Sequence, residues 1–151
     1  MRMLLAALAI AVFFNAAPSY ASDKRVHFAA FDVYLHSDDP VAAWQFELAD
    51  RHGLMKVVGV ENGESPAYPR APYYDREAVR LGTADRIIVA DYSLADVAQL
   101  PEGRIRVATV HLMIDDPVGT DFILNLITAT SSDGHALDAS LSFELRTGSD
   151  Q

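Results

Sequence analysis

The feature that most constrains the fold is a strict alternation of apolar and polar residues in two segments. In residues 42–48, Trp44 stands in the middle of an apolar row whose members are separated by polar residues such as Gln45 and Glu47. Residues 137–145 alternate as cleanly, with Phe143 in the apolar row and Glu144 beside it. Because successive side chains of a strand point to opposite sides, this pattern predicts strands that bury one face only. Trp44 is therefore expected in the core.

A turn signal precedes the last of these strands. The linking residues 131–135 contain Asp133 and Gly134, a step that supplies the positive φ angles of a tight hairpin. Residues 122–130 also have strand character. We therefore expect residues 122–130 and 137–145 to pair as a hairpin.

Four further segments complete the expected strands: residues 26–35, 55–60, 86–90 and 104–114. In the first of them the apolar phase changes between Phe28 and Phe31, which predicts a bulge or a switch of sheet at that point. Only residues 76–81 and 94–100 are expected to form short helical turns. Each half-polar strand needs a second apolar face to cover it, so the sequence predicts an all-β fold, an antiparallel two-sheet β-sandwich.

The order of these segments resembles that of the cohesin-like β-sandwiches, which are related to bacterial carbohydrate-binding modules. The resemblance covers nearly all of the chain after residue 21 and lies in the segments FDVYLHS, VAAWQFELAD, MKVVGVENG, IIVADYS, GRIRVATVHLMI, DFILNLITATSSDG and LDASLSFEL. It implies a cohesin-like jelly roll with a non-catalytic role, either the recognition of a calcium-loaded dockerin helix pair or the recognition of a polysaccharide. The chain has no duplicated Asp-rich calcium loop that would indicate a dockerin.

The first residues indicate export. Arg2 provides a positive charge, residues 4–14 form an uncharged apolar run, and small residues precede a cleavage point after Ala21. The run is well short of the roughly 20 residues that a membrane-spanning helix needs. We therefore expect residues 1–21 to be a signal peptide. Residues 22–151 are expected to form a single domain in the periplasm or the extracellular medium, with no membrane span in the mature form.

Composition narrows the range of partners. The chain holds 12 basic and 21 acidic residues, and removal of Arg2 with the leader leaves 11 basic residues and a net charge of −10. Such a surface repels phosphate backbones and anionic lipid headgroups, so no nucleic acid partner is expected. The chain contains no cysteine, which excludes thiol catalysis and thiolate metal sites. The expected partner is a protein or a polysaccharide.

The most irregular stretch, residues 61–75, contains three prolines and is predicted to be a long structured loop that recognises a ligand. Its rings and oxygen atoms make the candidate ligand-binding residues Glu61, Asn62, Glu64, Tyr68, Tyr73, Tyr74 and Asp75. The alternative is a stiffened connection whose tyrosines cap one end of the sandwich. Neighbouring side chains of an extended segment point to opposite sides, so at most one of Tyr73 and Tyr74 is expected to pack inward.

Metal sites and catalytic motifs have weak signals. The paired carboxylates Asp38-Asp39 and Asp115-Asp116 each precede a proline, where Asp commonly forms turns, and neither has EF-hand spacing. The five histidines lack zinc-site spacing, and the chain has no nucleophile elbow, GxGxxG or P-loop. We therefore expect no metal, no cofactor and no catalytic residue. The remaining enzymatic hypothesis is a glycosidase-like carboxylate pair such as Glu61 with Asp91, which depends on their separation in space.

The sequence thus predicts an exported, non-catalytic recognition or structural module, with a small secreted hydrolase as the alternative. The folded structure distinguishes these hypotheses. A protein-binding surface is expected to be a flat, partly apolar sheet face, and a polysaccharide site is expected to hold aligned exposed rings. A hydrolase is expected to have a concave pocket with two close carboxylates.

Overall fold

The computed structural model describes residues 26–147. The predicted signal peptide, residues 1–21, lies outside the described residues. The described chain forms the following elements in order: β1 (His27–Ser37), β2 (Ala43–Asp50), β3 (Met55–Asn62), α1 (Arg76–Arg80), β4 (Arg86–Tyr92), η1 (Val97–Gln99), β5 (Gly103–Ile114), β6 (Phe122–Thr130) and β7 (Ala139–Thr147). The two short helices lie where helical turns were expected, and every expected strand is present.

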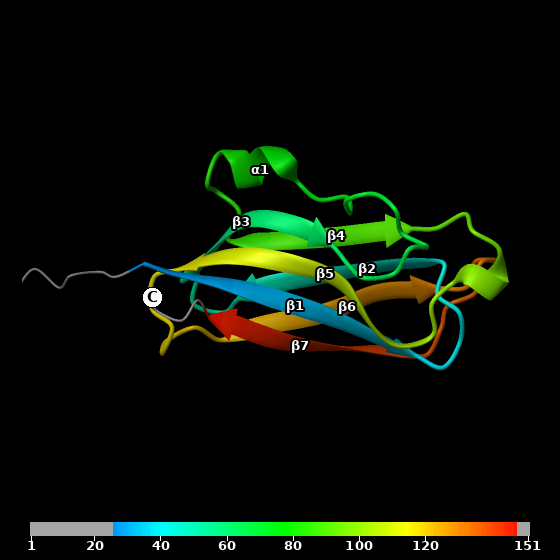
Figure 1. Ribbon diagram of the computed structural model, residues 1–151. Coiled ribbons are helices and arrows are strands. Elements are labelled where there is room, and N and C mark those ends of the chain that lie inside the picture. Colours follow the sequence, from blue (N-terminus) through cyan, green and yellow to red (C-terminus); the bar gives the residue numbers. More distant parts are fainter. Residues whose placement is uncertain (1–25, 148–151) are drawn as a thin grey trace, which may run out of the picture.

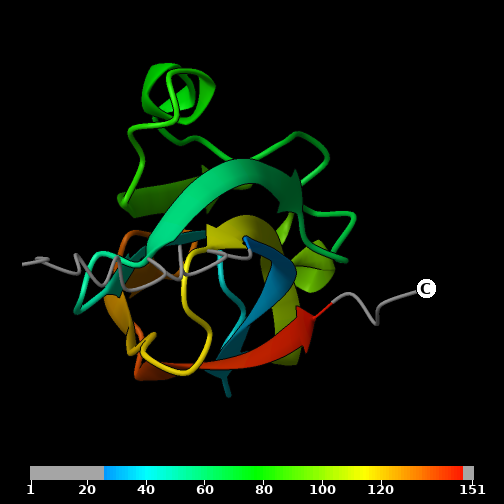
Figure 2. The same cartoon turned by 90° about the vertical axis from the view of Figure 1, so that its left-hand side faces the viewer.

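The seven strands build two antiparallel sheets. Sheet A has the order β3-β5-β1-β7 and sheet B the order β4-β2-β6. The two sheets form the layers of a sandwich, and α1 stands outside it on the side of β3 and β4 (Figures 1 and 2). The predicted all-β, antiparallel two-sheet β-sandwich is therefore confirmed.

The core lies between the inner faces of the two sheets. Trp44, Phe46 and Leu48 of β2 are buried, as the alternation predicted, while their polar neighbours are only partly covered. The Trp44 ring stacks on Phe46 with a centroid distance of 5.7 Å. From sheet A, Phe31 contributes a fully buried ring to the same core. The expected burial of Trp44 is thus confirmed.

The expected hairpin between residues 122–130 and 137–145 is wrong. β6 pairs with β2 in sheet B, whereas β7 pairs with β1 in sheet A. The turn itself forms, because Gly134 adopts a φ of 84° and Thr130 makes an isolated bridge to Ala136. Beyond that bridge the chain passes from one sheet to the other. A turn sequence fixes the reversal of the chain, but it does not determine which strand edge the following segment joins.

The expected irregularity near Phe28 is also misplaced. β1 pairs with β5 without a shift from His27 to Val33, and the register changes only between Val33 and Tyr34, where Val107 of β5 is the extra residue. Phe28 simply points to the outer face of sheet A, where it is exposed. The apparent change of apolar phase in the sequence therefore arises because Phe28 is an apolar residue on the solvent-facing side of a regular strand.

The connection between β3 and α1 is held by a few polar contacts. The Glu64 carboxylate accepts a hydrogen bond of 2.8 Å from the Arg106 amide of β5. A Cβ at Gly63 would lie 2.0 Å from the Arg106 carbonyl oxygen, so only glycine permits this approach. Asp75 caps α1 by accepting a hydrogen bond of 2.9 Å from the Ala78 amide. Among residues 26–147, no helix has the length and hydropathy that a bilayer crossing requires.

Candidate functional site

The structure disperses the seven candidate residues of the loop. Glu61 and Asn62 are the last residues of β3, in sheet A, and are not part of the loop proper. Glu61 lies on the outer face of sheet A, with Oε1 at 3.0 Å from Nε2 of His111, although this nitrogen lacks the geometry of a hydrogen bond. The Asn62 carbonyl accepts a hydrogen bond of 3.5 Å from Arg106. Glu64 and Asp75 are occupied by the backbone contacts described above.

Two of the three loop tyrosines serve the core. Tyr68 is buried, and its hydroxyl donates a hydrogen bond of 2.6 Å to the Val41 carbonyl. This burial raises the pKa of the Tyr68 hydroxyl. The Tyr74 ring packs against the core, with the Arg76 guanidinium 5.0 Å from its centroid. Tyr68 is therefore not available for stacking on a ligand, and the capping role considered for the loop applies to it and to Tyr74.

Tyr73 is the loop residue that faces solvent. Its backbone exchanges hydrogen bonds of 2.8 and 3.0 Å with Ala90, which adds it to the edge of β4. Tyr73 is 52% exposed and its ring lies parallel to that of Tyr92, which is 42% exposed, with an interplanar angle of 8° and a centroid distance of 6.0 Å. Tyr73 and Tyr74 thus point to opposite sides, as expected for an extended segment.

A groove begins beside this pair of rings. Its volume is about 580 Å³, and its lining includes Tyr92, Leu94, Pro66, Pro69 and Arg70. The Arg70 guanidinium lies 5.8 Å from the centroid of the Tyr92 ring, and it lowers the pKa of the Tyr92 hydroxyl. Among the described residues that line this groove, Arg70 alone is charged.

The outer face of sheet B continues from Tyr92. We call it the sheet B face and define it by the residues that the register places opposite to the core: Ala43, Gln45, Glu47, Ala49, Arg86, Ile88, Ala90, Tyr92, Ile123, Asn125, Thr128 and Thr130. Ile127, the extra residue of a bulge in β6, is also exposed. Glu47 and Arg86 are its only charged members, and they lie 3.4 Å apart. The sheet B face is therefore partly apolar and nearly uncharged.

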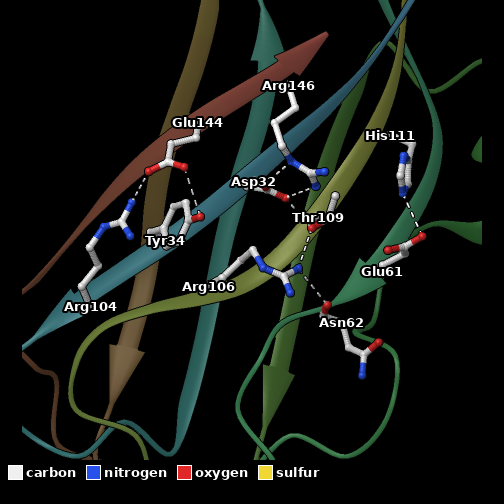
Figure 3. Close-up of polar contacts among 10 residues, drawn as sticks. All are labelled: Asp32, Tyr34, Glu61, Asn62, Arg104, Arg106, Thr109, His111, Glu144 and Arg146. Carbon is white, nitrogen blue, oxygen red and sulfur yellow. Dashed lines mark hydrogen bonds and ion pairs between the residues drawn. The ribbon is translucent and has the colours of Figure 1, made fainter. Parts of the chain in front are cut away.

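The outer face of sheet A carries more charged side chains, although Phe28 and Val58 are also exposed there and line a groove of about 550 Å³. Figure 3 shows its polar side chains, which come from β1, β3, β5 and β7. Arg146 binds the buried carboxylate of Asp32, and Arg104 binds Glu144 with an N–O distance of 2.7 Å. Charged groups on this face pair with one another across the strands, which is typical of a solvated surface. The contrast between the two faces singles out the sheet B face.

The hypothetical carboxylate pair does not form. Glu61 lies in sheet A and is exposed on its outer face, whereas Asp91 lies in sheet B and points toward the core. Asp91 Oδ1 accepts a hydrogen bond of 2.8 Å from the Tyr92 amide, while the buried Oδ2 has no hydrogen-bond partner among the described residues. Burial raises the pKa of Asp91. The two carboxylates therefore do not face a common substrate position.

The exposed apolar residues Ile88 and Ile127 of the sheet B face were not identified from the sequence. The signal was present in β4, because Ile88 alternates with Ile87 and Val89, so the strand is apolar on both sides. Within residues 26–147, no three His, Asp or Glu side chains gather closely enough to hold a metal ion. No family model, no curated protein and no solved structure matches this chain.

Proposed function

We propose that this chain is an exported, non-catalytic recognition module that binds a protein partner through the sheet B face. The observation that carries the proposal is the near absence of charge on this face in a chain whose acidic residues greatly outnumber its basic ones. The centres of protein interfaces are depleted of charged residues and enriched in aromatic ones. Ile88, Ile127 and Tyr92 provide exposed apolar area at positions spread over the face.

The resemblance to cohesin-like sandwiches implies a particular class of protein partner. In that family the partner is a calcium-loaded dockerin helix pair, which presents apolar side chains from helices. The exposed apolar side chains Ile88, Tyr92 and Ile127 offer such helices apolar contacts, and the small residues Ala43, Ala49 and Ala90 between them leave room for the helices. The cohesin-like assignment is part of the proposal, and it rests on the order and character of the segments together with the two-sheet architecture.

The experiment compares binding by matched surface variants of the mature domain. Ile88→Asp introduces a charge in the sheet B face, and Phe28→Asp introduces the same charge at an exposed apolar residue of sheet A. The wild-type domain and both variants are used as bait in the culture medium and periplasmic extract of the source cells, and each captured protein is then purified and titrated directly. The proposal requires that a purified partner binds the wild type and Phe28→Asp but loses at least about tenfold in affinity for Ile88→Asp. Equal affinity for all three domains contradicts it.

Chelation tests the nature of the partner. With EDTA, a dockerin-type partner loses its calcium and its binding, whereas another class of protein retains its affinity. The unfolding midpoint of the domain alone, measured with and without EDTA, is the control, because it separates an effect on the partner from an effect on this chain.

A polysaccharide is the second candidate, and the parallel rings of Tyr73 and Tyr92 favour it. Two exposed rings at an interplanar angle of 8° offer a stepped platform for the apolar faces of sugar rings. Affinity electrophoresis in gels containing polysaccharides tests this function. Retardation that is lost in the double variant Tyr73→Ala/Tyr92→Ala, and kept in Ile127→Ala, would support the polysaccharide over the protein partner.

Export is tested on the protein itself. Mass spectrometry of the extracellular and periplasmic fractions is expected to find a chain that begins at Ser22. A species that retains residues 1–21 in those fractions would overturn the proposed cleavage.

A further inference from the structure

β7 is an edge strand without the usual protection against pairing. β3 and β6 each carry a bulge along their pairing, and Tyr73 covers part of the edge of β4. β7 runs beside β1 over nine residues with no shift of register. Among the described residues, none pairs with its other edge. A long regular edge presents free N–H and C=O groups to another strand.

Apolar side chains accompany this open edge. Phe143 and Leu145 lie opposite the buried residues Val33 and Phe31 in the register, and the Phe143 ring stacks on Phe31 with a centroid distance of 4.3 Å. They therefore belong to the core side of sheet A, yet they are 43% and 39% exposed. The Phe122 ring of β6 lies against Phe143 with a centroid distance of 6.1 Å, but a large part of Phe143 and Leu145 still faces solvent.

The outer side of β7 carries charge that is already neutralised. Its charged residues are Glu144 and Arg146, and such charges commonly keep other strands away from an edge. Here Glu144 binds Arg104 at 2.7 Å and Arg146 binds Asp32 at 2.6 Å, both within the same chain (Figure 3). An approaching strand therefore meets compensated charges.

The sequence of β7 is self-complementary about Phe143. If two copies pair in antiparallel fashion with Phe143 opposite its symmetry mate, all nine residues overlap, and Leu141 of each copy lies opposite Leu145 of the other. On the outer side, Ser142 then lies opposite Glu144, and Ser140 opposite Arg146. No like charges stand directly opposite each other, and the larger apolar residues of the core side, Leu141, Phe143 and Leu145, all meet apolar residues, whereas Ala139 lies opposite Thr147.

We propose that the mature domain forms a two-fold symmetric dimer through β7, with sheet A continuing from one copy into the other. A second copy supplies both the missing backbone partners and the apolar cover. The dimer is independent of the sheet B face and leaves that face free.

Matched charge variants test the register. Ser142→Glu places a carboxylate opposite Glu144 of the partner copy twice in each dimer, and it is expected to raise the dissociation constant by roughly tenfold or more. Ser140→Glu places the same charge opposite Arg146 and is expected to preserve the dimer. Ser142→Ala is the control, because it removes the hydrogen bond of 2.7 Å between Ser142 and His36 without adding charge. Sedimentation equilibrium over a wide range of concentrations measures each constant.

Cross-linking tests the symmetry axis, and the absence of native cysteine makes the result specific. Under mild oxidation, Phe143→Cys is expected to form a disulfide-linked dimer on non-reducing gels, whereas Leu145→Cys and the exposed Leu94→Cys are not. Cross-linking of Leu145→Cys alone overturns this register. A wild-type domain that stays monomeric at all concentrations, or a dimer that tolerates Ser142→Glu unchanged, overturns the proposal even if Phe143→Cys fails to fold.

Discussion

Asp32 and Arg146 are joined by two hydrogen bonds, from Nε to Oδ2 at 2.6 Å and from Nη2 to Oδ1 at 3.0 Å, between the neighbouring strands β1 and β7. The two side chains differ in their surroundings, since Asp32 is only 6% exposed and Arg146 is 62% exposed. Thr109 donates a further hydrogen bond of 2.6 Å to Oδ1. Arg146 is thus the countercharge that allows a carboxylate to be buried in the outer face of sheet A.

This difference in exposure predicts unequal costs for removing the two partners. Arg146→Ala leaves a buried carboxylate with the Thr109 hydroxyl alone, and it is expected to lower the free energy of unfolding by about 1.5–3 kcal/mol. Asp32→Asn leaves a solvated guanidinium and is expected to cost about 1 kcal/mol. Urea denaturation at pH 7 and a fixed protein concentration measures both values. Equal losses would contradict the role assigned to Arg146.

The pH dependence of stability provides a second prediction for Asp32. The hydrogen bonds from Arg146 hold the pKa of Asp32 below its ordinary value, so the folded state favours the ionised form. This contribution is complete above the unfolded pKa of about 3.9 and is lost as the pH falls through the lower folded value. The destabilisation caused by Asp32→Asn should therefore be largest at neutral pH and shrink below pH 4. Thermal unfolding of both proteins across this range measures the difference.

Asp91 is expected to change the stability of the domain with pH in the opposite direction to Asp32. Burial raises its pKa, so the unfolded chain loses the proton at a lower pH than the folded domain does. Its effect on stability therefore becomes unfavourable as the pH rises above the unfolded value. Asp91→Asn keeps the acceptor for the Tyr92 amide and is expected to stabilise the domain by about 1 kcal/mol at pH 7, with no gain below pH 4. A destabilised variant at pH 7 would show that the ionised carboxylate is needed.

Trp44 offers a test of core packing without a polar contribution. Its ring is buried, and within residues 26–147 its Nε1 has no hydrogen-bond partner. Trp44→Ala is expected to cost about 3–5 kcal/mol because of the cavity that it leaves. Trp44→Phe retains most of the ring and loses no hydrogen bond, so we expect it to cost clearly less, about 1–2 kcal/mol. Chemical denaturation compares the two, and similar losses would mean that the indole nitrogen has a partner after all.

Variants of the three loop tyrosines test which of these side chains stabilise the fold and which are free to contact a ligand. Tyr73→Ala is expected to change the free energy of unfolding by less than about 0.5 kcal/mol, because the ring is solvent-facing. Tyr68→Phe removes the hydrogen bond to the Val41 carbonyl and is expected to cost about 1 kcal/mol, and Tyr74→Ala removes a ring that packs on the core and should cost more. Thermal unfolding of the three variants tests this order. If Tyr73→Ala were the most destabilising, the loop would act mainly as a structural cap.

The strand pattern allowed much of the burial to be predicted. Alternation in β2 identified Trp44, Phe46 and Leu48 as core residues, because a half-polar strand has only one side that it can bury. The same reasoning separated Tyr73 from Tyr74, since their opposite directions follow from an extended backbone alone. The same alternation in seven segments also predicted the antiparallel two-sheet sandwich.

Pairing and the character of the surfaces depended on the tertiary structure. β6 and β7 carry patterns that are compatible with many partners, and only assembly brought β7 to β1 instead of β6. Likewise, Ile88 and Asn125 belong to one nearly uncharged face only because β4 and β6 both flank β2. Local residues determine which side of a strand is apolar, but hydrogen bonding between strand edges is nearly the same for every sequence. The choice among edges is therefore made by how the apolar faces of all strands cover one another.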